Sequence, residues 1–189
     1  MRLLKSLLIP ALLPASLASA GQVHQHGVAH LDLVLEPPGL AISFRSPLAN
    51  LIGFEHQPGT AEEQAAWDRL LREIKQAEDQ ISLPAEADCS LSQVELYQPY
   101  PAPAVHEEHG QDHDHDHDHD HDHDHDHENH ADLMVEYHYL CANADQLKTL
   151  QLPFMGHYPG IETLEIQLLT PSGQHLRQLH AGEQVLSLP

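Results

Sequence analysis

A run of eight consecutive Asp-His pairs, residues 112–127, constrains the fold of this 189-residue chain more than any other feature. With its neighbours the run places eleven histidines between His106 and His130. The surrounding segment shows no apolar periodicity and is too densely charged to form a core, so we predict a disordered loop over residues 101–132. The core must therefore be built from two pieces of chain that flank this loop.

The first twenty residues have the pattern of a secretory signal peptide. Arg2 and Lys5 precede an apolar stretch that is too short to span a bilayer, and the small residues Ala18-Ser19-Ala20 follow it. We therefore predict a cleavable signal peptide over residues 1–20, cleavage before Gly21, and export to the periplasm. We predict no membrane anchor, because prolines interrupt the apolar stretch and no second one follows.

The mature chain, residues 21–189, is long enough for one domain with one core. Loss of Arg2 and Lys5 leaves six of the eight basic residues against 29 acidic ones. Such a balance disfavours nucleic acid and anionic membrane surfaces as partners and favours cations.

The chain has two cysteines, Cys89 and Cys141, one on each side of the Asp-His run. In an exported protein a lone pair of cysteines is typical of a disulfide, and closing a loop of about 50 residues would stabilise the fold by roughly 3–4 kcal/mol. We also expect such a bridge to hold the two ends of the predicted loop together. The alternative is a pair of thiolate metal ligands, which would have to stay reduced in an oxidising compartment.

Alternating apolar residues predict a sheet. Residues 28–36 and 40–45 flank a Pro-Pro-Gly turn and predict a β-hairpin, while 89–100 and 132–141 predict two neighbouring strands joined by the long loop. Shorter strands are expected in the C-terminal part, between turns at Tyr158-Pro159-Gly160, Pro171-Ser172-Gly173 and Ala181-Gly182-Glu183.

One long amphipathic helix is predicted over residues 60–81. Thr60 and Glu63 form a capping box, and apolar residues from Trp67 to Ile81 recur at helical spacing. The predicted fold class is therefore α+β, with an antiparallel β-sheet or sandwich, one long helix and the disordered His/Asp-rich loop.

The loop has the chemistry of a metal-binding segment of high capacity. Neutral imidazole suits Zn²⁺, which takes about four ligands, and a neighbouring Asp can orient each ring or bind the ion directly. At three or four imidazoles per ion, the segment could hold on the order of three Zn²⁺ ions, with Cu²⁺ or Ni²⁺ as competitors. The acidic neighbours are expected to raise the pKa values of these histidines from about 6.5, so mild acidification would release metal.

Histidines outside the loop offer a second set of candidate ligands. His24, His26 and His30 recur at even spacing, which on an extended chain places them on one side, and His56 follows a Gly-Phe-Glu sequence. The alternative is that His24 and His26 lie on a frayed N-terminus, that His30 is a surface strand residue and that His56 is a structural histidine at a helix or turn boundary. The full set of candidate metal ligands is His24, His26, His30, His56, His106, His109, His113, His115, His117, His119, His121, His123, His125, His127 and His130.

Several segments together resemble the ZrgA family of zinc-regulated, zinc-binding exported proteins of Gram-negative bacteria. They are HQHGVAHLDLVLE, ISFRSPLANLIGFEHQP, Cys89 before a His/Asp-rich insert, and the C-terminal ETLEIQLLTPSGQ. The resemblance implies a periplasmic accessory to zinc uptake that hands metal to the binding protein of a zinc ABC importer. It also implies that His24, His26 and the loop histidines bind the metal, with His56 in a shared sequence block.

The sequence predicts a binding protein rather than an enzyme. The chain has no helical His-Glu-x-x-His motif, no nucleophile elbow and no glycine-rich phosphate loop. The predicted function is to capture or buffer Zn²⁺ and to support its uptake. The alternatives are a nickel or copper homeostasis protein and, more remotely, a zinc-dependent hydrolase that uses His24 and His26.

Overall fold

The computed structural model describes residues 25–100 and 131–189. The predicted signal peptide, His24 and the candidate ligands from His106 to His130 lie outside the described residues.

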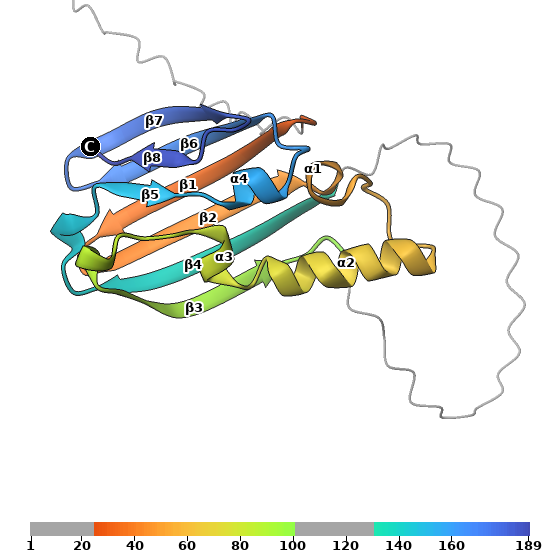
Figure 1. Cartoon of the computed structure of the whole chain (residues 1–189), viewed down its shortest axis with the longest axis horizontal. Coiled ribbons are helices and arrows are strands. Elements are labelled where there is room, and N and C mark those ends of the chain that lie inside the picture. The colour runs from red at the N-terminus through yellow and green to blue at the C-terminus, as the bar shows by residue number, and fades with distance from the viewer. Residues whose placement is uncertain (1–24, 101–130) are drawn as a thin grey trace, which may run out of the picture.

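A six-stranded sheet forms the body of the protein (Figure 1), and its strands follow the order β3-β4-β2-β1-β6-β7. A smaller sheet pairs β5 with β8. The predicted hairpin is confirmed, because β1 and β2 pair antiparallel around the Pro37-Pro38 turn. The bounds are β1 Val28–Glu36, β2 Gly39–Pro47, β3 Cys89–Tyr97, β4 Asp132–Cys141, β5 Thr149–Gln151, β6 Thr163–Thr170, β7 Gly173–His180 and β8 Val185–Ser187.

The main sheet is mixed rather than wholly antiparallel. β1 pairs with β6 in parallel, with Leu31 opposite Ile166, while the other described ladders of this sheet are antiparallel. Parallel neighbours need a long crossover connection, and here the chain between β1 and β6 supplies β2, β3, β4 and the covering elements. The α+β class is confirmed, but the prediction of a purely antiparallel sheet is wrong at this one pair.

The predicted long helix is wrong, because the chain forms two shorter helices in its place. The capping box is present, with the Glu63 amide donating to Thr60 Oγ1 at 3.2 Å, but α2 ends at Glu73. Two side chains satisfy carbonyl groups at the end of this helix. Gln80 Nε2 donates to the Glu73 carbonyl at 3.0 Å, and the Tyr137 hydroxyl donates to the Ile74 carbonyl. Burial raises the pKa of Tyr137, so its hydroxyl keeps the proton that it donates.

In the sequence, the helical spacing of apolar residues continues past the end of α2 because the short helix α3 buries its residues on the same side. Ala77 and Ile81 are 2% and 3% exposed, although they no longer belong to the first helix. The described helices are α1 Leu48–Ile52, α2 Ala61–Glu73, α3 Ala77–Gln80 and α4 Phe154–His157, with 3-10 turns at Ala85–Ala87 and Ala144–Gln146. None of these helices is long and apolar enough to cross a bilayer.

The two faces of the main sheet differ. The helices and the β5–β8 pair lie on one side of it (Figure 1), and alternate residues of the central strands are buried there. This core includes Leu31, Ile42, Val135, Tyr137 and Ile166. Alternation with period two turns the remaining residues of the same strands to the opposite face, where they are half-buried or exposed.

The predicted bridge between Cys89 and Cys141 is present. The two cysteines pair in register at one end of the β3–β4 ladder. Tyr97 and Met134 pair at the opposite end, where the chain leaves β3 and enters β4. The expectation that the bridge holds the ends of the His/Asp-rich segment together is therefore wrong. Both sulfur atoms are in the disulfide, which also removes them as thiolate ligands.

Candidate metal-binding site

His26 lies in a tight turn that immediately precedes β1. The Val28 amide donates to the Gln25 carbonyl at 3.2 Å, and Gly27 has a φ of +81°, which favours glycine. The Gly27 carbonyl accepts from the amides of Glu162 and Thr163 at 2.8 and 2.9 Å, which ties the turn to the start of β6. The extended conformation that would place His26 and His30 on one side of a strand is therefore not formed.

A buried asparagine of α1 holds this turn from the other side. Asn50 is 5% exposed; its Oδ1 accepts from the Gly27 amide at 2.7 Å, and its Nδ2 donates to the Val28 carbonyl at 3.0 Å. Nδ2 also lies 3.2 Å from Ser46 Oγ. The amide thus satisfies its own polar atoms and fixes the backbone beside His26, a role that its sequence position did not indicate.

The imidazole of His26 lies against a carboxylate that follows α1. His26 Nε2 is 2.9 Å from Glu55 Oε1; the His26 side chain is 64% exposed, whereas that of Glu55 is only 14% exposed. A largely buried carboxylate with an accessible imidazole beside it can orient the ring or share a metal ion with it.

His56 forms a second pair with the capping residue of α2. His56 Nε2 is 3.0 Å from Glu63 Oε1, while Glu63 Oε2 accepts from the amides of Gly59 and Thr60 at 2.9 and 3.0 Å. The Gly59 amide, the His56 side chain and the Thr60 amide together lower the pKa of Glu63. Glu63 therefore stays ionised and keeps negative charge beside His56.

His30 forms a looser pair on the uncovered side of the sheet. Its Nδ1 is 3.6 Å from Glu165 Oε2 on the neighbouring strand β6, where the two residues are in register. A fourth pair of the same kind joins His138 Nε2 to Glu136 Oε2 at 3.6 Å on β4. Residues 25–100 and 131–189 contain no group of three or more His, Cys, Asp or Glu side chains arranged to hold a metal ion.

Of the two described neighbours of segment 101–130, Tyr100 contacts the Glu55 backbone and Ala131 contacts the start of α1. Tyr100 packs its ring on Trp67, with centroids 5.8 Å apart, and donates its hydroxyl proton to the Glu55 carbonyl. On the other side, the Leu48 amide donates to the Ala131 carbonyl at 2.8 Å. Tyr100, the residue before the segment, therefore contacts the Glu55 backbone, and Ala131, the residue after it, contacts the start of α1.

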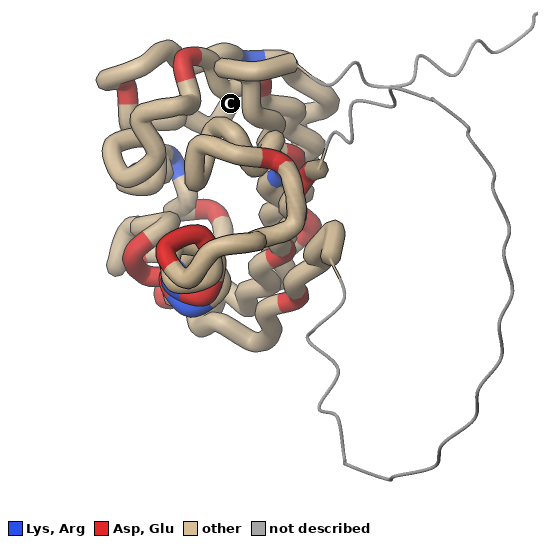
Figure 2. Tube along the Cα trace, turned by 90° about the vertical axis from the view of Figure 1, so that its right-hand side faces the viewer, with Lys and Arg blue, Asp and Glu red and all other residues tan. Residues whose placement is uncertain are grey.

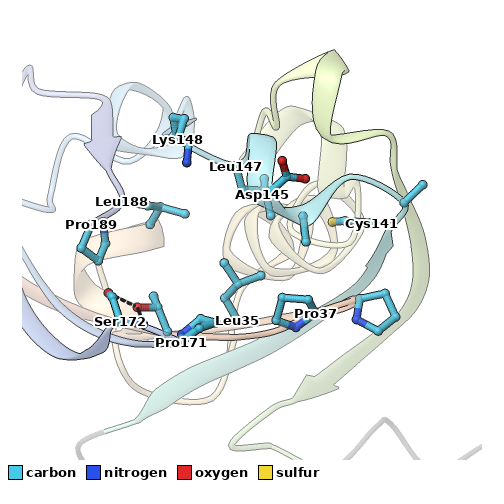
Figure 3. A pocket seen from close by; sticks show the side chains of 14 residues that line it. Leu35, Pro37, Cys141, Asp145, Leu147, Lys148, Pro171, Ser172, Leu188 and Pro189 are labelled. Atoms are coloured by element: carbon cyan, nitrogen blue, oxygen red, sulfur yellow. Dashed lines mark hydrogen bonds between the residues drawn. The ribbon is translucent and has the colours of Figure 1, made fainter.

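One hollow among the described residues lies at the far end of β1 and does not have the chemistry of a zinc site. Its volume is about 560 Å³, and Leu35, Pro37, Leu147 and Cys141 line it together with Lys148 (Figure 3). No histidine contributes to its lining. Compared with this hollow, the His–Glu pairs are the better candidates for metal binding.

The charge of the described domain also favours cations, because acidic positions far outnumber basic ones along the tube in Figure 2. Sequence reasoning identified His26, His30 and His56 but not their carboxylate partners. The pairing of Glu55 with His26 depends on how α1 lies against the N-terminal turn, and the pairing of His56 with Glu63 depends on where α2 begins.

The sequence pattern of a family described as "ZrgA family zinc uptake protein" matches residues 23–188, which is nearly the whole chain. No curated protein matches the chain.

Proposed function

The chain belongs to the ZrgA family of zinc uptake proteins, and on this premise we propose that it captures Zn²⁺ with its His/Asp-rich segment and the His–Glu pairs of the domain. The proposed location is the periplasm, after removal of the signal peptide. The proposed outcome is that captured zinc passes to the binding protein of a zinc ABC importer. Uptake is a binding role, and we propose no catalytic turnover.

The separation of nitrogen and oxygen in the His–Glu pairs carries the proposal. Zinc bonds of about 2.0–2.1 Å in tetrahedral geometry place two ligand atoms roughly 3.3 Å apart. The four pairs have nitrogen–oxygen separations of 2.9, 3.0, 3.6 and 3.6 Å. Each pair could therefore supply two of the four ligands of one ion with little movement.

Two ligands are half of what zinc takes, and this explains why the pairs and the segment would act together. Histidines of residues 106–130 would supply the remaining ligands, a proposal supported by the contact of Tyr100 with the Glu55 backbone and of Ala131 with the start of α1. A site shared between the domain and the segment binds more weakly than a closed four-ligand site. A lower zinc affinity of this kind suits a protein that passes its zinc to a carrier.

The same ligand types also bind Cu²⁺ and Ni²⁺, and in the usual order of affinity Cu²⁺ binds more tightly than Zn²⁺. A copper or nickel protein is therefore the second candidate. A zinc hydrolase would need three protein ligands with an open water position, and the described residues contain no such group.

Chelator competition on the protein of residues 21–189 tests the proposal. His26→Ala and Glu55→Gln should each lower the affinity of the tightest zinc site by about 10- to 100-fold, as expected for loss of a ligand or of its orienting partner. His175→Ala is the matched control, because His175 contacts Ser172 Oγ at 3.2 Å rather than a carboxylate. Equal isotherms for the three variants and the original protein would contradict the role of the pair, and tighter binding of Ni²⁺ or Cu²⁺ with no response to Zn²⁺ would favour the second candidate.

A further inference from the structure

One face of the six-stranded sheet is left uncovered by the described elements, which all lie on its other side (Figure 1). Strand register identifies its residues: Asp32 faces the same way as Ser43 and Glu136 on one side and as Gln167 and Leu176 on the other. With six strands about 4.8 Å apart and about eight residues of 3.3 Å each, the face measures roughly 750 Å². This is close to the ~800 Å² that each partner contributes to a stable protein interface.

Most of the large exposed apolar side chains of the described residues lie on this face, on β3 and β4 at one side and on β6 and β7 at the other. Of the six found in the described residues, four point outward from it: Tyr97, Leu140, Leu169 and Leu176, the last of which is 69% exposed. Val34 lies directly opposite Leu169, and the two line a shallow hollow of about 300 Å³. A solvated sheet face normally carries polar residues, so exposed leucines across it indicate a contact surface.

The charges on this face are almost all negative. Its described carboxylates are Asp32, Glu36, Glu95, Asp132, Glu136 and Glu165, whereas Arg45 is its one Lys or Arg among the described residues. Glu95 lies directly opposite Glu136, whose carboxylate is also 3.6 Å from His138 Nε2, and like charges directly opposite one another destabilise a sheet. The pKa of the Tyr97 hydroxyl is raised by its hydrogen bond to Glu95, by desolvation and by the charges of Glu95 and Glu136.

Charge decides between the occupants that this face could take. A second copy of the chain would bring the same carboxylates against one another, and the segment 106–130 of the same chain carries eight aspartates of its own. A basic surface would instead pair with the carboxylates while its apolar centre covered Leu169 and Leu176. We propose that the uncovered sheet face docks a partner protein whose contact surface carries Lys and Arg side chains around an apolar patch.

This inference goes beyond zinc capture, which needs no docking face, and it does not assume the proposed transfer of zinc to an importer protein. Its first test places a photo-crosslinking amino acid at Ser43, in the centre of the face, in cells that produce the full chain. The matched control places the same group at Gln64, on the exposed side of α2. The expected result is one adduct, formed from Ser43 and not from Gln64, whose partner is identified by mass spectrometry and carries a basic contact surface.

The second test measures affinity between the protein and the purified partner identified by the crosslink. The paired change Asp32→Lys with Glu36→Lys, and separately Leu176→Ser, should each weaken binding at least tenfold, and 0.5 M salt should weaken it further. The control Glu62→Lys with Asp68→Lys makes the same change of net charge on α2 and should alter affinity less than twofold. Thermal melting checks that each variant is folded.

Several outcomes would overturn the docking proposal. These are no adduct from Ser43, an adduct to a second copy or to residues 106–130, equal adducts from Gln64, or equal weakening by the α2 control. None of these readouts depends on zinc, so such a failure would leave the proposed zinc capture standing.

Discussion

Removing the amide of Asn50 should loosen both the fold and the candidate metal site. Asn50→Ala deletes the hydrogen bonds to the Gly27 amide, the Val28 carbonyl and Ser46 Oγ. Because Asn50 is 5% exposed, water cannot easily replace its amide group. The turn that carries His26 would then lose its contact with α1.

The size of the effect follows from these three bonds. At about 1 kcal/mol of net stability each, Asn50→Ala should lower the free energy of unfolding by about 3 kcal/mol. For a chain of this length that corresponds to a fall in Tm of roughly 6–12 °C. Zinc affinity should also fall about tenfold although Asn50 is no ligand, because the backbone of His26 is no longer fixed.

Urea unfolding of the original protein and the variant measures the first effect, and chelator competition measures the second. Asn143→Ala is the control, since the Asn143 side chain is exposed and donates one 3.2 Å bond to the Glu86 carbonyl. It should cost about 1 kcal/mol or less. A loss below 1 kcal/mol for Asn50→Ala, or an unchanged zinc affinity, would refute the claim that this amide positions His26.

Three further predictions concern stability. Replacing Cys89 and Cys141 with Ala should lower the unfolding free energy by about 4 kcal/mol, given the sequence separation of 52, with little change in the number of bound zinc ions; urea titration and metal analysis check both. Glu63 stabilises the fold at pH values above its ordinary pKa of 4.5, and this contribution should disappear as pH falls through its lowered pKa in the folded protein. The urea midpoint of Glu63→Gln should therefore depend less on pH in that range than that of the original protein. Gly160→Ala would place Cβ 2.5 Å from the Asn50 carbonyl oxygen and should cost about 1–3 kcal/mol in the same assay; an unchanged midpoint would show that the backbone can yield.

Local patterns predicted those parts of the fold that depend on neighbouring residues in the chain. Period-two alternation identified the β1–β2 hairpin and the antiparallel pairing of β3 with β4, and Thr60 with Glu63 identified the start of α2. Alternation reveals which side chains are buried but not which strand lies alongside. The parallel pairing of β1 with β6 therefore could not be predicted.

The helix break at Ile74 has a similar cause. Helical spacing of apolar residues persists through Ala77 and Ile81, while the groups that end α2 come from Gln80 and from Tyr137 on a distant strand. Tertiary hydrogen bonds of this kind leave no trace in a periodic pattern. The prediction therefore had the buried side right and the continuity wrong.

The candidate site shows the same division. Histidine is readily recognised as a ligand type, so His26, His30 and His56 could be named from sequence. Their partners Glu55, Glu63 and Glu165 are 29, 7 and 135 residues away, and only the folded chain brings each carboxylate to its imidazole. The ligand types were predictable, and their pairing was not.

The central claim is that zinc binds to the His/Asp-rich segment together with the His–Glu pairs of the domain. Metal analysis after equilibrium dialysis of residues 21–189, with and without residues 106–130, tests it most directly. The account predicts that the deletion removes on the order of three zinc ions per chain while the urea unfolding curve stays the same. An unchanged zinc content in a folded deletion variant would contradict it.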